Sequence, residues 1–196
     1  MVLPVLVKFP FATQPWALPV LAAFPPEWDR VHGTRHKTPA HLAQLLLARL
    51  MRWFPERHLI FVGDSGYGTS ESARFCSKHR RHLTLVGTCY GDAALYAPPP
   101  PRTRRTMGRP RVNGQKLASP QAGVANTATR TSLMVTWYGG TPRGIEIVTG
   151  TGHWYRIGEA LVEVRWVYVH DGAGTHRDES FLTTDLRLCP KWIVEC

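Results

Sequence analysis

The 196-residue sequence is poor in cysteine, in acidic residues and in long apolar segments. Its four cysteines form no C-x-x-C pair, which excludes the ligand spacing of a common zinc site and a dense disulfide framework. Few, unpaired cysteines favour a reducing, cytoplasmic setting. At the N-terminus no basic segment precedes the apolar residues, and prolines interrupt them at Pro4, Pro10, Pro15 and Pro19. This pattern argues against an export signal and against a membrane span.

The shortage of acidic residues leaves the chain strongly basic. It has 24 Lys and Arg against 14 Asp and Glu, a formal net charge of +10. Such an excess suits an anionic partner, and nucleic acid is the commonest one. A solvated basic surface gives the same composition, so the charge alone does not identify a partner. The hydrophobic fraction of 43% and the seven Trp indicate a globular chain with a buried core.

Residues 1–90 alternate between strand and helix patterns. The clearest element is an amphipathic helix, in which Leu and aromatic residues recur at three- and four-residue spacing between the capping Thr38 and Pro55. The predicted elements are a strand over 2–11, a helix over 39–54, a strand over 58–63, a helix over 70–80 and a strand over 82–87. This order predicts an α/β fold with at least partly parallel strand pairing.

The character of the chain changes after residue 90. A proline tract and a basic segment occupy positions 98–116, and the rest is rich in strand patterns separated by glycine turns. The predicted strands cover residues 132–137, 145–149, 161–170 and 181–184. We therefore expect residues 91–186 to form a basic crossover and a β-rich subdomain, and residues 187–196 to begin a return to the first part.

Asp64 is the residue best placed for chemistry. It directly follows the apolar strand, and small residues on either side leave its carboxylate free. Open α/β sheets bind ligands at the carboxyl ends of their parallel strands, where a carboxylate suits a hard cation such as Mg²⁺. An aspartate at this point can instead cap the following turn through backbone amides, and the local sequence leaves both interpretations open. Ser65 and Tyr67 are candidates to orient it through hydrogen bonds.

The basic segment is the second candidate site. Arginines at close spacing, in a segment kept extended by proline and glycine, can follow a phosphate backbone. A solvated loop explains the same residues equally well on the sequence alone. The candidate nucleic-acid-binding residues are Arg102, Arg104, Arg105, Arg109, Arg111 and Lys116.

Two groups that contain histidine have structural explanations. His153 stands beside Trp154 and Tyr155 after a glycine turn, and a structural corner explains it better than a catalytic base does. Near the C-terminus, acidic residues and histidines surround a second glycine turn, and their spacing fits no metal-ligand pattern. We interpret them as a charged hairpin loop: His170, Asp171, His176, Asp178 and Glu179.

Several longer segments occur in the same order along the chain as in a known family. HKTPAHLAQLLLARLMRWFPERH and FVGDSGYGTSESARFC precede DAALYAPPPP, RTRRTMGRPRVNGQKL, VTWYGG, VTGTGHWY, VRWVYVHD and GTHRDESFLTTD. Together they resemble the transposases of bacterial insertion sequences, DDE superfamily endonucleases with an RNase H-like fold. The resemblance implies a partial RNase H-like core around Asp64, as the second catalytic aspartate, and an inserted β-rich subdomain. It also implies a cytoplasmic, nucleoid-associated protein with DNA as partner and Mg²⁺ or Mn²⁺ as cofactor.

The mechanism of that family uses two Asp and one Glu to hold two metal ions. Asp64 matches one of these positions. The acids before it, Glu27, Asp29 and Glu56, lie in no predicted buried strand, and Glu195 precedes the point where the family's Tyr-Arg-Glu-Lys signature is expected. The resemblance therefore leads us to expect an internal transposase fragment, inactive on its own. The alternatives are a non-catalytic module that binds DNA, itself or an intact transposase, and a remnant without function.

Overall fold

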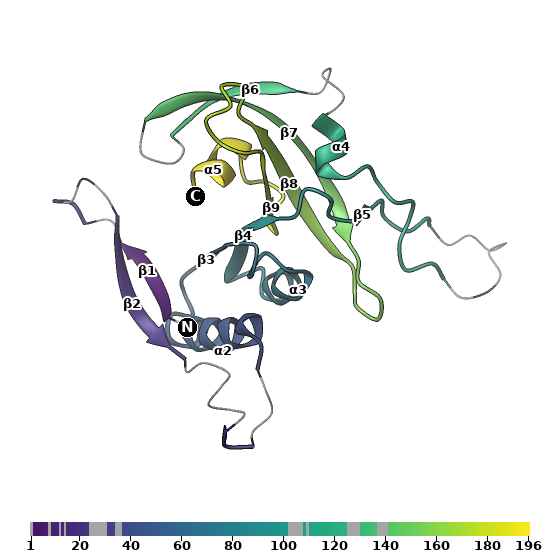
Figure 1. Cartoon of the computed structure of the whole chain (residues 1–196). Helices are drawn as coiled ribbons and strands as arrows, with labels where there is room; N and C mark the ends of the chain where they lie inside the picture. Colours follow the sequence, from purple (N-terminus) through teal and green to yellow (C-terminus); the bar gives the residue numbers. More distant parts are fainter. Residues whose placement is uncertain are drawn as a thin grey trace. The chain divides into compact units, whose positions relative to one another are not determined.

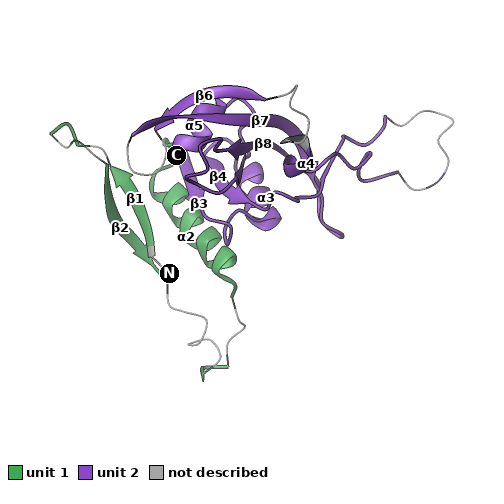
Figure 2. Ribbon diagram, turned by 45° about the horizontal axis from the view of Figure 1, so that its top comes forward, with its two compact units in different colours: residues 1–57 green, residues 58–196 purple. Residues whose placement is uncertain are grey.

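The computed structural model describes residues 2–7, 9–11, 13, 15–23, 31–33, 37–101, 108, 110–124, 130–136 and 141–196. The chain forms two compact units, residues 1–57 and residues 58–196, coloured separately in Figure 2. In the described part of the chain, no helix is long and apolar enough to cross a membrane.

The first unit contains an antiparallel hairpin and a helix. Strand β1 (Val2–Val7) pairs with β2 (Trp16–Ala22), and helix α2 covers Pro39–Trp53. Thr38 caps α2, because its Oγ1 accepts the N–H of His41 at 3.1 Å. The predicted helix is confirmed to within one residue, whereas the predicted first strand ends early and β2 was not predicted. Both strands contain a proline, Pro4 and Pro19, which an edge strand tolerates.

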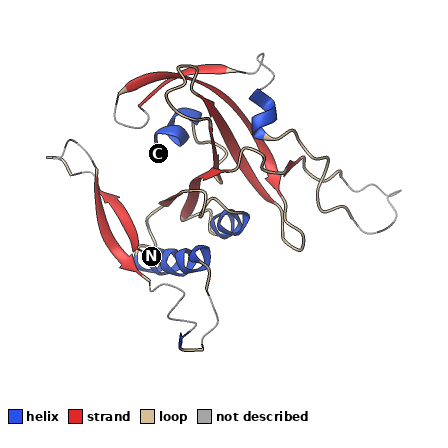
Figure 3. Cartoon of the chain, viewed as in Figure 1, coloured by secondary structure: helices blue, strands red, loops and turns tan. Residues whose placement is uncertain are grey.

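The second unit is built on one seven-stranded sheet with short helices against it (Figures 1 and 3). The strands follow the order β3-β4-β9-β8-β7-β5, and β6 also pairs with β7. Their bounds are β3 (Leu59–Gly63), β4 (Leu83–Cys89), β5 (Leu95–Tyr96), β6 (Thr131–Thr136), β7 (Pro142–Trp154), β8 (Val162–His170) and β9 (Glu179–Thr183). β3 and β4 are parallel, which confirms the expected parallel pairing, and the other pairs are antiparallel.

The helices of this unit are α3 (Ser70–Lys78), α4 (Pro120–Val124) and α5 (Pro190–Glu195). One core cluster joins α5 to strands β4, β6, β7, β8 and β9. It consists of Val86, Val135, Ile145, Ile147, Val167, Val169, Phe181, Ile193 and Val194. Side chains alternate along β4, so Leu83 and Leu85 point away from this cluster. Helix α3 lies against β4 and β8 and buries Ala73 and Cys76 completely.

The sheet continues across the boundary that the sequence suggests at residue 90. Strand β4 pairs with β9 from Val86↔Thr183 to Cys89↔Ser180, so the α/β part and the β-rich part share one hydrogen-bonded sheet. The compact units divide after Arg57 instead. The mixed α/β class is confirmed, and the division into a partial RNase H-like core and an inserted subdomain stays a prediction.

Two strands differ from their predicted form. In β3 only Phe61 is buried, whereas Ile60 and Val62, whose side chains lie on the opposite face of the sheet, are each 44% exposed. The prediction of a buried strand is therefore right for one face only. Strand β7 runs on through Gly150, where a turn was expected, because the ring of Trp166 on β8 covers that glycine.

Candidate active site

Asp64 lies at the carboxyl end of the parallel β3–β4 pair, and it is exposed. Its Oδ1 accepts the N–H of Gly66 at 2.9 Å. Its backbone carbonyl accepts the N–H groups of Tyr67 and Gly68 at 2.9 and 2.8 Å. One carboxylate oxygen thus caps the turn, as the local sequence allowed. The other, Oδ2, has no partner among the described residues, so it can take a ligand.

Glycines hold the Asp64 loop against the end of β4. A Cβ on Gly68 would lie 1.9 Å from the carbonyl oxygen of Thr88, and one on Gly87 would lie 2.9 Å from the carbonyl oxygen of Gly63. Both distances are shorter than any real contact of a Cβ, so only glycine permits this approach. The run from Gly63 to Gly68 therefore fixes the position of Asp64 through close backbone packing.

The neighbours of Asp64 do not orient its carboxylate as the sequence suggested. Tyr67 packs its ring against Phe61, with the centroids 6.0 Å apart, and its backbone rather than its hydroxyl bonds to Asp64. The hydroxyl of Ser65 makes no hydrogen bond to Asp64 in the described part of the chain. The backbone N–H of Gly66, and neither of these side chains, bonds to the carboxylate.

A cavity of about 330 Å³ opens beside Asp64, and Glu195 also lines it. Glu195 ends α5, and its Oε1 accepts the N–H of Thr136 at 2.9 Å and lies 3.8 Å from Nζ of Lys191. Sequence reasoning set Glu195 aside because it precedes the family's signature. No local signal marks it, since its place in the cavity follows from the packing of Ile193 and Val194 in the core.

Asp64 and Glu195 line one cavity, and both carry a carboxylate, the ligand type that Mg²⁺ prefers. Mg²⁺ commonly binds one or two protein carboxylates and keeps several waters, which Asp64 and Glu195 in one cavity allow. Within the described ranges, no group of three or more His, Cys, Asp or Glu is placed to hold a metal.

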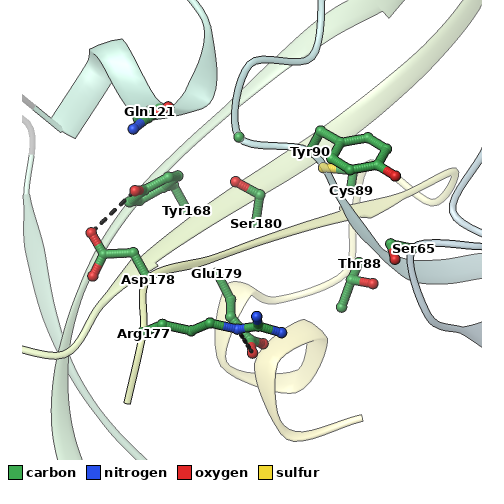
Figure 4. Close-up of a pocket in the computed structure, with 11 residues that line it drawn as sticks. Ser65, Thr88, Cys89, Tyr90, Gln121, Tyr168, Arg177, Asp178, Glu179 and Ser180 are labelled. Atoms are coloured by element: carbon green, nitrogen blue, oxygen red, sulfur yellow. Dashed lines mark hydrogen bonds and ion pairs between the residues drawn. The ribbon is translucent and has the colours of Figure 1, made fainter. Parts of the chain in front are cut away.

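A second cavity, of about 410 Å³, adjoins the same loop (Figure 4). Ser65 lines it, and Thr88 lines both cavities. In its wall, Asp178 accepts a hydrogen bond from Oη of Tyr168 at 3.1 Å and lies 2.8 Å from Nδ1 of His170. Burial, reinforced by the bond to Asp178, raises the pKa of Tyr168, so this phenol stays a hydrogen-bond donor.

The loop between β8 and β9 is organised by Asp171, which is 4% exposed. Its carboxylate accepts the hydroxyl of Thr175 at 2.6 Å and the backbone N–H groups of Ala173, Thr175 and His176 at 3.0–3.2 Å. It also lies 3.8 Å from Nη1 of Arg143. The interpretation of these residues as a charged hairpin loop agrees with these contacts.

His153 lies within β7 rather than at a turn, so the prediction of a corner is wrong. It pairs with Tyr96 on β5, and Tyr96 packs edge-on against Tyr155 with ring centroids 5.9 Å apart. Its backbone is paired on both sides, with Tyr96 on β5 and with Glu163 on β8.

The structure describes two of the six candidate nucleic-acid-binding residues. Arg111 and Lys116 are both exposed, near a short ladder in which the backbones of residues 95–97 and 114–117 pair. This ladder closes the base of the basic segment. The remaining candidates lie outside the described residues: Arg102, Arg104, Arg105 and Arg109.

Comparison with known proteins identifies the family. The family described as DDE superfamily endonuclease matches residues 3–144, well over half of the chain. The match includes Asp64, its glycine loop and the basic segment, and it ends within β7. Neither the curated proteins nor the solved structures gave a match. The chain belongs to the DDE superfamily endonucleases.

Proposed function

We propose that this chain serves DNA transposition, in a transposase of the insertion-sequence type, with Asp64 as a ligand of the catalytic metal. The observation that carries this proposal is the state of Asp64. Its Oδ1 is held by Gly66, while Oδ2 has no partner in the described structure, beside a cavity at the carboxyl end of two parallel strands. Membership of the endonuclease family supplies the chemistry for which such a carboxylate is needed.

When bound, Mg²⁺ or Mn²⁺ supplies activation of a water or a DNA 3′-hydroxyl and stabilises the leaving oxygen. Asp64 would hold the ion through its carboxylate, of which Oδ1 accepts the N–H of Gly66 and Oδ2 has no partner among the described residues. Glu195 offers a second carboxylate from α5, positioned by the N–H of Thr136. The backbone amides of the glycine loop keep Asp64 in place while the ion binds.

We infer an RNase H-like core from the order of elements. The hairpin β1–β2, helix α2, strand β3, helix α3 and strand β4 follow one another, with β3 and β4 parallel and Asp64 directly after β3. Strands β5 to β9 would then be an insertion, which extends the sheet of the core through β9.

DNA is the partner that the charge favours. The net charge of +10 and the exposed Arg111 and Lys116 provide positive charge that phosphate groups can neutralise. We infer that the chain binds transposon ends in the cytoplasm, at the nucleoid.

We also infer that the chain alone does not cut DNA at a measurable rate. The resemblance in sequence assigns Asp64 to one of the three carboxylate positions of the family, and the described residues group no three metal ligands. Losing members of a catalytic unit costs roughly 10⁴- to 10⁶-fold in rate. The chain would then work as a DNA-binding module, in association with itself or with an intact transposase.

The first test measures Mn²⁺ binding by titration calorimetry. We expect Asp64→Asn to weaken Mn²⁺ binding at least about tenfold, since it removes a charged ligand and keeps the capping oxygen. Asp92→Asn, at an exposed aspartate without a described contact, is the matched control and should bind Mn²⁺ like the wild type. Equal affinity in all three proteins would exclude Asp64 as a ligand.

The same proteins can be incubated with labelled duplex DNA and Mg²⁺ or Mn²⁺. We expect no cleavage by the wild-type chain. Cleavage that Asp64→Asn abolishes would show that the chain is active by itself, and it would leave the metal-binding role of Asp64 intact. The binding and cleavage assays therefore separate the two parts of the proposal.

A further inference from the structure

The cavity beside Ser65 contains a buried hydroxyl without a partner. Ser180 on β9 is 5% exposed, and its Oγ makes no hydrogen bond to the described residues. Figure 4 shows this hydroxyl among the residues that line the cavity. A buried polar atom without a partner costs free energy, which a ligand that bonds to it would recover.

Aromatic and amide groups surround Ser180. Tyr90, which is 70% exposed, and Tyr168 present aromatic rings to the cavity, and Gln121 presents a carboxamide (Figure 4). The backbone N–H of Gln121 donates to the carbonyl of Gly91 at 3.0 Å, which holds the start of α4 beside the cavity. Rings that stack, with an amide and a hydroxyl that bond to ring edges, form the usual recognition set for a nucleobase.

The charges of the cavity favour a neutral group over a phosphate. Two acidic residues, Asp178 and Glu179, line the cavity with one basic residue, Arg177. Nε of Arg177 lies 3.9 Å from Oε1 of Glu179. The side chain of Arg177 is 90% exposed, so it can meet a phosphate outside the cavity. Cys89 offers no nucleophile, because burial raises the pKa of its thiol to about 12.

We propose that this cavity binds the base of one unpaired nucleotide of the DNA, with its phosphate outside beside Arg177. The proposal rests on the proposed function, because it takes DNA as the partner. The volume of about 410 Å³ suits a small ligand rather than a duplex. Ser65 in the wall places such a base next to the loop that carries Asp64.

The test compares two labelled duplexes by fluorescence anisotropy, in EDTA so that no metal contributes. One duplex carries a single bulged nucleotide and the other is fully paired. We expect the wild-type chain to bind the bulged duplex roughly tenfold more tightly, as stacking of one base predicts.

Two variants address the cavity itself. A Cβ on Gly91 would lie 3.4–3.5 Å from Tyr168, Gln121 and Ser180, so Gly91→Leu fills the space from an unstrained position. It should reduce the preference to less than twofold, while Gly172→Leu, where a Cβ meets nothing within 4 Å, should keep it. Ser180→Ala, which leaves the cavity open, should lower the preference severalfold.

Each outcome bears on a separate statement. Equal binding of both duplexes by the wild type overturns the nucleobase pocket and leaves DNA binding standing. A preference that survives in folded Gly91→Leu and in Ser180→Ala also overturns it. Failure to bind either duplex overturns DNA as the partner, and the pocket with it.

Discussion

The two oxygens of one carboxylate have different tasks in the Asp64 loop. Oδ1 caps the turn through Gly66, and Oδ2 has no partner in the described chain. Turn capping and metal binding are alternatives on the sequence, and this geometry allows both. The sequence could place Asp64 at the end of a strand because that signal is local: an apolar strand followed by small residues. It could not identify Glu195, Ser180 or Gln121, whose places depend on contacts between distant segments.

The close packing at Gly68 gives a prediction for a single residue. Gly68→Ala places a methyl group 1.9 Å from the carbonyl oxygen of Thr88, so the loop must move away from β4. We expect the free energy of unfolding to fall by about 3 kcal/mol in urea denaturation. Gly172→Ala is the control, since its Cβ meets nothing within 4 Å. Equal stability of the two variants would show that the loop does not depend on this contact.

Elements with a strong local pattern are the ones that the sequence predicts. Helix α2 has a cap and regular apolar spacing, and β3, α3 and β4 are bounded by glycine, threonine and polar turns. Helix α5 was not predicted, because it is short and Cys189 provides no side-chain cap. Its formation depends on burying Ile193 and Val194 in the core, which is a tertiary effect.

The loop from β8 to β9 should make the free energy of unfolding depend on pH in the acidic range. Hydrogen bonds from the Thr175 hydroxyl and from backbone amides lower the pKa of Asp171 to about 2, although burial opposes them. A carboxyl whose pKa is lowered on folding stabilises the protein above its unfolded pKa, near 4, and loses this effect as the pH falls towards 2. We expect the free energy of unfolding to decrease over that interval.

Asp171→Asn should remove this part of the pH dependence and lower stability at pH 7, because its amide cannot accept the same bonds. Asp92→Asn serves again as the control and should keep the slope of the wild type. Urea unfolding at several pH values between 2 and 7 measures both effects. A slope that Asp171→Asn leaves unchanged would contradict this role of the loop.

At the scale of the whole molecule, the continuous sheet could not be predicted. The N–H of Leu85 donates to Oγ1 of Thr184, 99 positions along the chain, and β4 pairs with β9 beside this bond. No local pattern specifies a partner at that separation. The change in composition near residue 90 is real, but strand pairing crosses it.

The net charge predicts how DNA binding by the chain depends on salt concentration. Replacing Arg111 and Lys116 by Ala should make the slope of log K against log salt less steep by about 2, since two phosphate contacts are lost. Replacing the exposed Arg80 and Arg81 by Ala changes the charge equally and is the control. Anisotropy titrations between low and moderate salt measure the slopes. If the slope became less steep by the same amount in both double variants, DNA binding would respond to net charge alone. Arg111 and Lys116 would then make no defined contact with phosphate groups.

The pairing of β4 with β9 also bears on how the chain folds during synthesis. β4 ends at Cys89, and its partner begins only at Glu179. At about 5–20 residues per second, the ribosome needs several seconds to add the intervening segment. Until then the edge of β4 opposite β3 has no strand to pair with, and non-local pairings of this kind form slowly. Newly made chains would therefore expose this edge, where pairing with another copy competes with folding.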